Sequence, residues 1–426
     1  MKKHYDIVIV GGGMVGATLA CALAAQPATA HLTVLLVDAQ PPALSKEERV
    51  SFDSRSTALS AASRLILERF GLWSSIAAGA CPIEKIQVSD HGRFGTTTLA
   101  RDEFDVPALG YVVENSVFSA ALNAELARLP SCTVLAPAKI TAAVPSVGGM
   151  RVTVAAVSES SAASAQPKEL TAKLVVVAEG GRSSLCEQLG IVRSQHDYGQ
   201  HALITNVGLG QAHAGVAYER FTRTGPLAML PLLPVDGEQR ASLVWTLAAD
   251  EAQAYASLSD TELLARLQRQ FGWRLGRLQR LGERVIYPLS LRVAQEQVRP
   301  NVVLLGNVAH TLHPVAGQGM NLSLRDIDAL VLTLGESERE RTAAEEETET
   351  ETKHPELALG SMCTLNKYLH KREDDQALMI GVTDGLTKLF SSDDKARVLL
   401  RKAGLLSIDL IPALKKTFGA RAMGFD

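Results

Sequence analysis

The sequence predicts an α/β fold with mixed α/β and α+β character: a Rossmann-like domain interrupted by a β-sheet domain and followed by a C-terminal helical region. An apolar, β-branched run at 5–10 leads through glycines into a small-residue helix at 14–25 and a second strand at 32–38, the β-α-β order of a parallel sheet. Further strand-like runs follow much later, separated by enough chain for a second sheet, at 133–136, 151–156, 173–178 and 302–305. Residues 360–418 carry apolar side chains at helical spacing, which predicts the helical region.

The composition is that of an ordinary globular protein. The chain has 426 residues, 46% of them hydrophobic and 21% charged, with a formal net charge of -3. This length allows one large domain or two connected ones. The charge balance provides no basic field, so no nucleic-acid partner is expected. The five cysteines form no C-x-x-C pair, so we expect reduced thiols in a cytoplasmic protein and no metal site.

The ends of the chain bear on its location. The apolar run after MKKHYD is short and meets three glycines, so it is interpreted as a strand and not as an export signal. The chain also lacks a run of eighteen apolar residues, so no spanning helix is expected. Near the C-terminus, apolar rows are interleaved with Lys395, Arg397, Arg401, Lys402, Lys415 and Lys416. Such a region suits peripheral contact with an inner membrane, a partner protein, or the protein's own core.

The first glycine-rich motif indicates a dinucleotide site. Gly11, Gly13 and Gly16 form a G-x-G-x-x-G between the first strand and the first helix, and Asp38 ends the next strand. In this pattern the first glycine permits a tight turn, the second admits a pyrophosphate, and the third allows close helix packing, while the acidic residue binds a ribose. The cofactor could be NAD or FAD on this evidence.

A second glycine-rich stretch, LLGNVAHTLHPVAGQGMNLSLRD at 304–326, decides for FAD. A cofactor held by two motifs about three hundred residues apart must be long. Gly317 and Gly319 would let backbone N–H groups approach a flat ring, and the helix that begins near Gln318 would direct its positive end at the ring. His313-Pro314 fixes the loop that enters this turn.

These motifs together resemble those of the flavoprotein aromatic hydroxylases with the p-hydroxybenzoate hydroxylase fold. The similarity extends from Asp6 to about Asp384 and is greatest to the ubiquinone-biosynthesis branch that includes 2-octaprenyl-6-methoxyphenol hydroxylases. Its motifs are GGGMVG at 11–16, SFDSRSTALS at 51–60, VVAEGGRSSL at 176–185, YERFTRTGPLAMLPL at 218–232, FGWRLG at 271–276 and the stretch at 304–326.

The resemblance implies the remaining site residues. Arg55 falls where the family places an arginine near the flavin, and Glu114-Asn115 resembles a helix-start contact with the cofactor. Where the family usually has Asp-Gly and Gly-Asp, this chain has Glu179-Gly180 and Gly306-Asn307. The implied FAD ligands at the last motif are Gly306, Asn307, Gly317, Gln318, Gly319, Met320 and Asn321. The residues implied at the oxygen-activating face are His313, Pro314, Gly317 and Gly319.

The resemblance also implies a reaction. NAD(P)H would reduce FAD, and a flavin C4a-hydroperoxide formed with O2 would hydroxylate a polyprenylated phenol in ubiquinone synthesis. Other ubiquinone-biosynthesis proteins are expected as partners. Two alternatives stay open: a related monooxygenase of a soluble aromatic, and a non-catalytic flavin-binding scaffold subunit. The candidates for a general base on the phenol, by residue type alone, are His201, His310, His313, Tyr218, Glu219 and Arg220.

The resulting domain order alternates between two domains. The predicted segments are an FAD-binding domain, first part, at 1–80; substrate-domain strands at 81–100; the FAD-binding domain, second part, at 101–192; the substrate-binding domain at 193–290; the flavin clamp at 291–335; an acidic flexible loop at 336–358; and C-terminal helices at 359–426. The substrate-binding domain is predicted to contain a strand at 241–247 and a helix at 259–271. The acidic segment is expected to begin as a solvated helix end before the mobile loop.

Overall fold

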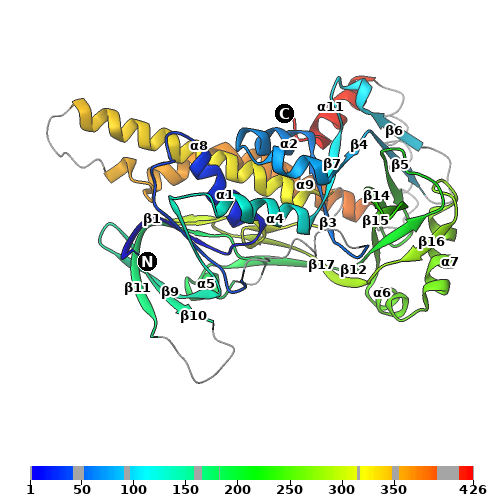
Figure 1. Cartoon of the computed structure of the whole chain (residues 1–426), viewed down its shortest axis with the longest axis horizontal. Helices are drawn as coiled ribbons and strands as arrows, with labels where there is room; N and C mark the ends of the chain where they lie inside the picture. The colour runs from blue at the N-terminus through cyan, green and yellow to red at the C-terminus, as the bar shows by residue number, and fades with distance from the viewer. Residues whose placement is uncertain are drawn as a thin grey trace.

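The computed structural model describes residues 2–41, 52–90, 96–157, 166–181, 183–313, 317–347, 355–390 and 412–425. Within them the chain forms three β-sheets and a layer of helices (Figure 1). The predicted mixed fold is confirmed. The β-α-β unit is present as strand β1 (His4–Val10), helix α1 (Met14–Ala25) and strand β2 (Val34–Val37).

The first sheet is the Rossmann-like one, and its central strands are parallel. Its order is β18 (Val298–Arg299), β19 (Val302–Leu304), β11 (Lys168–Val177), β1, β2 and β8 (Cys132–Leu135), and β10 (Gly149–Ala156) pairs with both β11 and β9 (Ala138–Ser146). The core of β1 is apolar on both faces, because Ile7 and Ile9 pack toward the helices while Val8 and Val10 pack toward β9 and β10. That two-sided burial explains the continuous apolar run in the sequence.

The second sheet is mostly antiparallel. Its order is β20 (His310–Thr311), β17 (Val285–Ala294), β12 (Arg193–Leu209), β15 (Glu238–Ala248), β14 (Pro226–Val235), β13 (Val216–Phe221), β5 (Lys85–Asp90) and β6 (Thr96–Ala100), with β16 (Leu278–Leu281) paired to β12. One face is covered by α6 (Ala249–Ala256) and α7 (Asp260–Phe271), which lie at the end of the molecule away from β1 (Figure 1). Helix α7 begins with a capping box between Ser259 and Glu262, which satisfies two otherwise unpaired N–H groups.

A third, three-stranded sheet lies between the other two layers. It consists of β3 (Ser56–Ser60), β7 (Gly110–Glu114) and β4 (Ala80–Ile83). The segment predicted at 81–100 therefore contributes to two sheets, because β4 pairs with β7 while β5 and β6 join the second sheet. Short elements complete this region: α2 (Ala61–Arg69), α3 (Trp73–Ile76), α5 (Ser184–Gln188), and the 3-10 helices η1 (Ala77–Gly79), η2 (Arg101–Glu103) and η3 (Gly306–Val308).

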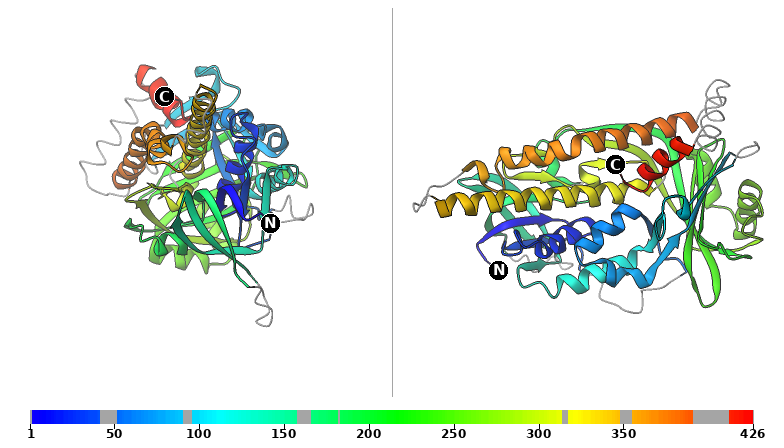
Figure 2. Two further views of the ribbon diagram at one scale, coloured as in Figure 1. Left: turned by 90° about the vertical axis from the view of Figure 1, so that its left-hand side faces the viewer. Right: turned by 90° about the horizontal axis from the view of Figure 1, so that it is seen from above.

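Helices cover one face of the Rossmann-like sheet. These are α1, α4 (Asn115–Leu126), α8 (Gln318–Glu347) and α9 (Met362–Phe390), with η5 (Pro355–Leu357) between the last two. Helices α8 and α9 lie side by side along the long axis of the molecule (Figure 2). Among the described residues, no helix is both long enough and apolar enough to cross a membrane.

The acidic segment at 336–358 begins as the predicted helix end, but this part of the helix is partly buried and not only solvated. Helix α8 continues through it as far as Glu347, and the side chains of Ser337 and Glu338 are buried. The reason is pairing with α9 and along the helix: Lys371 binds Glu336 at 2.6 Å and Arg341 binds Glu345 at 2.7 Å. Residues 348–354 lie outside the described part.

The described part of the C-terminal region packs on the protein itself. Helix α11 (Pro412–Ala422) brings Met423 into an apolar cluster with residues of β4, β6 and β7, and the carbonyl oxygen of Met423 accepts a hydrogen bond from the Ala62 N–H at 3.0 Å. Lys415 binds Glu103 at 2.7 Å. The cations at 395–402, on which the predicted membrane contact depended, lie outside the described residues.

Candidate functional site

A cavity of about 580 Å³ lies where the three sheets meet. One wall is the open face of the second sheet, and it is largely apolar, with Ile86, Ile204, Ala217, Ala228, Leu230 and Val244. The opposite wall combines Ser56, Thr57 and Ala58 of β3 with residues of the glycine-rich motifs. The structure therefore brings together segments that are far apart in the sequence.

The first glycine-rich motif has the local geometry that its pattern predicts. Gly11 has a φ of 107°, and a Cβ there would lie 2.8 Å from the carbonyl oxygen of Ala178. A Cβ on Gly16 would lie 1.9 Å from the carbonyl oxygen of Gly11. Gly13, in contrast, lines the cavity, and a Cβ there would meet no atom within 4 Å. Gly11 and Gly16 thus serve the turn and its packing, while Gly13 leaves space for a ligand.

A smaller cavity of about 210 Å³ lies beside the first one and contains Asp38. The Asp38 carboxylate accepts hydrogen bonds from the N–H of Gly12 at 2.5 Å and of Gln40 at 2.7 Å. These bonds hold it at the mouth of the motif, and a carboxylate can accept about two more. Gly13 and Met14 line both cavities. An elongated ligand could therefore lie across the start of α1.

The start of α1 is suited to an anion. Gly13 is its N-cap and provides no side-chain hydrogen bond, and the first turn carries no acidic residue. The N–H groups and the positive end of the helix dipole are consequently left for a ligand, which is the usual arrangement at a pyrophosphate.

The second glycine-rich motif lines the larger cavity. Gly317, Gln318, Gly319 and Met320 all contribute, and a Cβ on Gly319 would meet no atom within 4 Å. Asn321 lies just behind them. Its side chain accepts from the N–H of Ser60 at 2.8 Å and from the Ser63 hydroxyl at 2.7 Å, and it donates to the carbonyl oxygens of Ala58 and Gly317. It therefore positions β3 and the glycine turn. Pro314 lies outside the described residues.

His313 is placed differently from the other residues of this motif. It is buried, does not line the cavity, and packs edge-on against the ring of Tyr198 with 5.4 Å between the ring centroids. Burial lowers the pKa of His313 to about 4, so the ring is neutral at neutral pH. Its catalytic role, predicted from the resemblance, finds no support in this position.

Glu179, Gly180 and Asn307 also line the larger cavity. Glu179 accepts a hydrogen bond from the Ser183 hydroxyl, so its longer side chain is held at the start of α5. Asn307 is exposed on the cavity wall. Gly306 has a φ of 76° and packs under α1, where a Cβ would lie 3.1 Å from the side chain of Val15. Arg55 is exposed and donates to the Tyr287 hydroxyl, and it is not among the residues that line the cavity.

Glu114 has a structural partner. Its carboxylate pairs with Arg240 of β15, and the two side chains are 6% and 1% exposed. Burial raises the pKa of Glu114, although Arg240 opposes the shift. The predicted helix-start contact is therefore an ion pair that joins the second and third sheets.

Of the six candidates for a general base, Tyr218 and Glu219 line the larger cavity. Burial raises the pKa of Glu219 to about 7. Arg220 is directed to Ser89, at 3.4 Å. His201, His310 and His313 do not line the cavity.

Sequence reasoning missed a buried network behind the clamp. Asp326 on α8 accepts hydrogen bonds from His310 at 2.6 Å, Arg372 at 2.7 Å and Gln376 at 2.9 Å. Burial acts to raise the pKa of Asp326, but His310, Arg372 and Gln376 outweigh it and lower the pKa to about 2. No sequence pattern predicts this network, because Asp326 and Arg372 come into contact only when α8 and α9 pack together.

The residues present fit FAD. Gly13, Gly180 and Gly319 line the cavity and leave open space where a Cβ would lie. The cavity for a flat ring, the uncapped helix start and the cavity at Asp38 follow one another in the order of a flavin, a pyrophosphate and a ribose.

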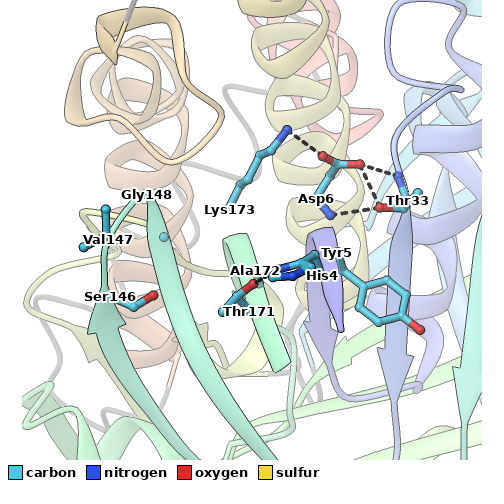
Figure 3. Close-up of a pocket in the computed structure, with 11 residues that line it drawn as sticks. His4, Tyr5, Asp6, Thr33, Ser146, Val147, Gly148, Thr171, Ala172 and Lys173 are labelled. Atoms are coloured by element: carbon cyan, nitrogen blue, oxygen red, sulfur yellow. Dashed lines mark hydrogen bonds and ion pairs between the residues drawn. The ribbon is translucent and has the colours of Figure 1, made fainter. Parts of the chain in front are cut away.

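A further cavity, of about 450 Å³, lies at the amino end of the central strand β1, next to residues of β9, β10 and β11 (Figure 3). Its charged groups are paired with each other: Lys173 binds Asp6 at 2.8 Å, and Asp6 accepts from the N–H and the hydroxyl of Thr33, each at 2.8 Å. None of the predicted site residues lines it.

Comparison with known proteins points to the same cofactor. The family model described as "FAD binding domain" matches residues 4–354. The chain is 35% identical to ubiquinone hydroxylase UbiL of Rhodospirillum rubrum, over 99% of this chain and 90% of that protein. It is 29% identical to 3-demethoxyubiquinol 3-hydroxylase of Escherichia coli, over 98% of each. Among solved structures, p-nitrophenol 4-monooxygenase PnpA from Pseudomonas putida has a TM-score of 0.74 at 17% identity, over 100% of this chain and 99% of that one, which concerns the fold alone.

Proposed function

Because the chain belongs to the FAD binding domain family and is an FAD-dependent monooxygenase, we propose that it hydroxylates the ring of a polyprenylated phenol in ubiquinone synthesis. The proposed substrate is of the 2-octaprenyl-6-methoxyphenol type. One observation carries this proposal: the cavity that holds the two glycine-rich motifs has the apolar face of the second sheet as its other wall. An aromatic ring would lie between that face and the flavin.

The overall reaction sets what the protein must do. A ring C–H, O2, NAD(P)H and one proton give a ring C–OH, water and NAD(P)+. FAD supplies the electron transfer and the oxygen activation when it is bound. The polypeptide binds, orients and excludes water. Gly13, Gly180 and Gly319 would admit the cofactor because they leave open space in the cavity. Asp38 and Asn307 would offer hydrogen-bonding groups to its hydroxyls, and Gln318 and Gly319 at the start of α8 would contact its ring system.

The apolar sheet wall orients the substrate. Its aliphatic side chains at Ile204, Ala228, Leu230 and Val244 favour a ring with alkyl substituents over a charged soluble aromatic, because burial of apolar surface contributes about 25 cal/mol per Å². A volume of about 580 Å³ is of the usual size for a small-molecule site. The relatives named for ubiquinone hydroxylation support the choice of ring.

A polyprenylated phenol is dissolved in the bilayer, so the proposal includes peripheral contact with the membrane and with other ubiquinone-biosynthesis proteins. The proposal also includes the predicted domain order, in which FAD-binding and substrate-binding segments alternate along the chain. The residues that the proposal assigns to FAD are Gly11, Gly13, Gly16, Asp38, Glu179, Gly180, Gly306, Asn307, Gly317, Gln318, Gly319 and Met320.

The test is deletion of the gene in its own host, followed by mass spectrometry of the quinone precursors. We expect a prenylated phenol that lacks one ring hydroxyl to accumulate, and the gene on a plasmid should restore ubiquinone. An unchanged quinone pool in a host with no other such hydroxylase would refute the proposal.

Assays with purified protein distinguish the proposed function from the two alternatives, a monooxygenase of a soluble aromatic and a non-catalytic scaffold subunit. The holoprotein should oxidise NAD(P)H faster with a short-chain prenylated methoxyphenol than with p-hydroxybenzoate, and the oxidation should yield a hydroxylated product. A preference for the soluble acid would favour the soluble-aromatic enzyme. Protein that binds FAD but consumes no NAD(P)H with any phenol would favour the scaffold subunit.

A further inference from the structure

One carboxyl group stands in the apolar wall of the cavity. Ile204, Val244, Ala228 and Glu219 form a single row across β12, β15, β14 and β13, because each is the registered partner of the next. All four line the cavity. The row continues to Val88 of β5. Glu219 therefore occupies a position at which its neighbours in the row are aliphatic.

The alternation of β13 separates Glu219 from its neighbours along the strand. Successive side chains point to opposite faces of a sheet. Tyr218 packs edge-on against Phe271 of α7, with 5.4 Å between the ring centroids, so its ring belongs to the covered face. Glu219 belongs to the open face with Ala217. Of the two base candidates that line the cavity, Glu219 is the one directed into it.

The surroundings of Glu219 explain why its pKa is raised. Burial raises the pKa of Glu219 to about 7, and no other described residue contributes to the shift. The other titratable residues in the described cavity lining are Tyr218, whose ring lies on the covered face, and Glu179, which accepts from Ser183. Arg220, the next residue of β13, is directed to Ser89 of β5. The strands on either side place Ala228 and Val88 beside it.

We propose that Glu219 is the general base that accepts the proton of the substrate's phenol hydroxyl. This inference rests on the proposed function. The phenol O–H bond breaks as the proton moves to a carboxylate oxygen of Glu219, and the electron pair left on the phenol oxygen increases the electron density of the ring carbons. The ring is then a better nucleophile toward the activated oxygen. Glu219 is thus assigned as a catalytic residue.

The first test compares E219Q with wild-type holoprotein on two substrates. One is a short-chain prenylated 2-methoxyphenol, and the other is its ring-fluorinated analogue, chosen so that its hydroxyl is already ionised at the assay pH. With the first substrate, E219Q should turn over about 100-fold or more slowly, the usual contribution of a general base. With the fluorinated substrate, the loss should be less than about tenfold, because no proton needs to be removed. An equal loss on both substrates would overturn the proposal.

The pH profile gives a second measure. Wild-type kcat should rise with pH through about 7 as Glu219 ionises, and E219Q should lack that rise. Y218F should keep it, as should E169Q, a control on an exposed strand position of the first sheet. A rise lost in Y218F and kept in E219Q would assign the base to Tyr218 instead.

A binding measurement is independent of turnover. Flavin fluorescence of the holoprotein would report binding of the prenylated 2-methoxyphenol and of its methyl ether. Wild type should prefer the phenol increasingly as pH rises through 7, since an ionised carboxylate is the stronger acceptor, and E219Q should show a preference that is independent of pH. If wild type binds with this pH dependence but hydroxylates no phenol, the proposed function fails and the assignment of Glu219 as proton acceptor stands. If E219Q does not retain FAD, the measurement is made with E219D instead. E219D keeps a carboxylate, so its preference for the phenol should still depend on pH. A preference in E219D that does not depend on pH would overturn the proposal.

Discussion

The Nε2 atom of His310 lies 2.6 Å from Oδ2 of Asp326, and the two side chains are 0% and 1% exposed. His310 belongs to the short strand β20 that leads into the second glycine-rich motif, and Asp326 lies on the helix that follows this motif. Arg372 of α9 binds the other oxygen of Asp326. The second glycine-rich motif is thus held at both of its ends by one buried carboxylate.

Replacing this carboxylate should destabilise the protein strongly. In D326N, the buried Arg372 would keep only Asp375 as a charged partner, and His310 would lose the charge of its acceptor. Loss of one partner from a buried pair costs up to about 3–5 kcal/mol. The measurement is the urea midpoint followed by fluorescence. E340Q is the matched control, since the Glu340–Lys367 pair joins the same two helices in an exposed position and should change stability by less than about 1 kcal/mol. Equal effects of the two variants would contradict the prediction.

Acid should destabilise the protein through His313. Its pKa is about 4 in the folded protein, below the ordinary histidine value of 6.5 that applies to the unfolded chain. The unfolded chain therefore takes up a proton first as the pH falls. The stability that comes from keeping His313 neutral is fully present above about pH 6.5. It is lost as the pH falls from 6.5 to 4, and the total loss is roughly 3 kcal/mol. H313Q should flatten the dependence of stability on pH over this range. Unfolding midpoints of H313Q that fall with pH as steeply as those of wild type would argue against it.

Two alanine substitutions in one motif should have opposite signatures. G13A puts a methyl group into the open cradle and should weaken FAD binding tenfold or more, about 1.4 kcal/mol, with little change in stability. G11A requires a φ of 107° and a contact of 2.8 Å with Ala178, so it should impair folding. Flavin content and thermal unfolding distinguish the two. If G13A bound FAD with full affinity, the start of α1 would not be part of the FAD site.

Asn307 offers a gain-of-function test. Its side chain is exposed on the cavity wall, and a carboxylate there would accept a charge-assisted hydrogen bond, which is roughly twice as strong as a neutral one. N307D should therefore bind FAD several-fold more tightly than wild type, and N307A several-fold more weakly. Fluorescence titration of the apoprotein with FAD measures both. Weaker binding by N307D would show that the amide is the better partner.

Local patterns made much of the fold predictable. The strand 5–10, the glycine turn and the helix 14–25 were expected because each depends on neighbours within a few residues, and β1 and α1 match them. The same holds for α7, expected at 259–271 from its apolar face. The glycine positions were predictable for the same reason, since the demands on Gly11 and Gly16 arise within one turn of chain.

Long-range register was not predictable. Whether Glu219 or Tyr218 faces the cavity depends on a one-residue register in β13, since a shift by one residue exchanges the faces of a strand. Asp326 and His310 look like ordinary members of the motif until α9 supplies Arg372. The burial of Ser337 and Glu338 in the acidic helix end was likewise not predictable, because it depends on the packing of α9 against α8.

The walls of the larger cavity come from chain positions between Gly13 and Ser323. During synthesis the N-terminal motif leaves the ribosome long before the second one, at about 5–20 residues per second. The nascent chain consequently cannot close around FAD until some three quarters of it has been made, roughly twenty seconds to a minute after it begins. Cofactor insertion therefore comes late in the synthesis of this protein, after both glycine-rich motifs have left the ribosome.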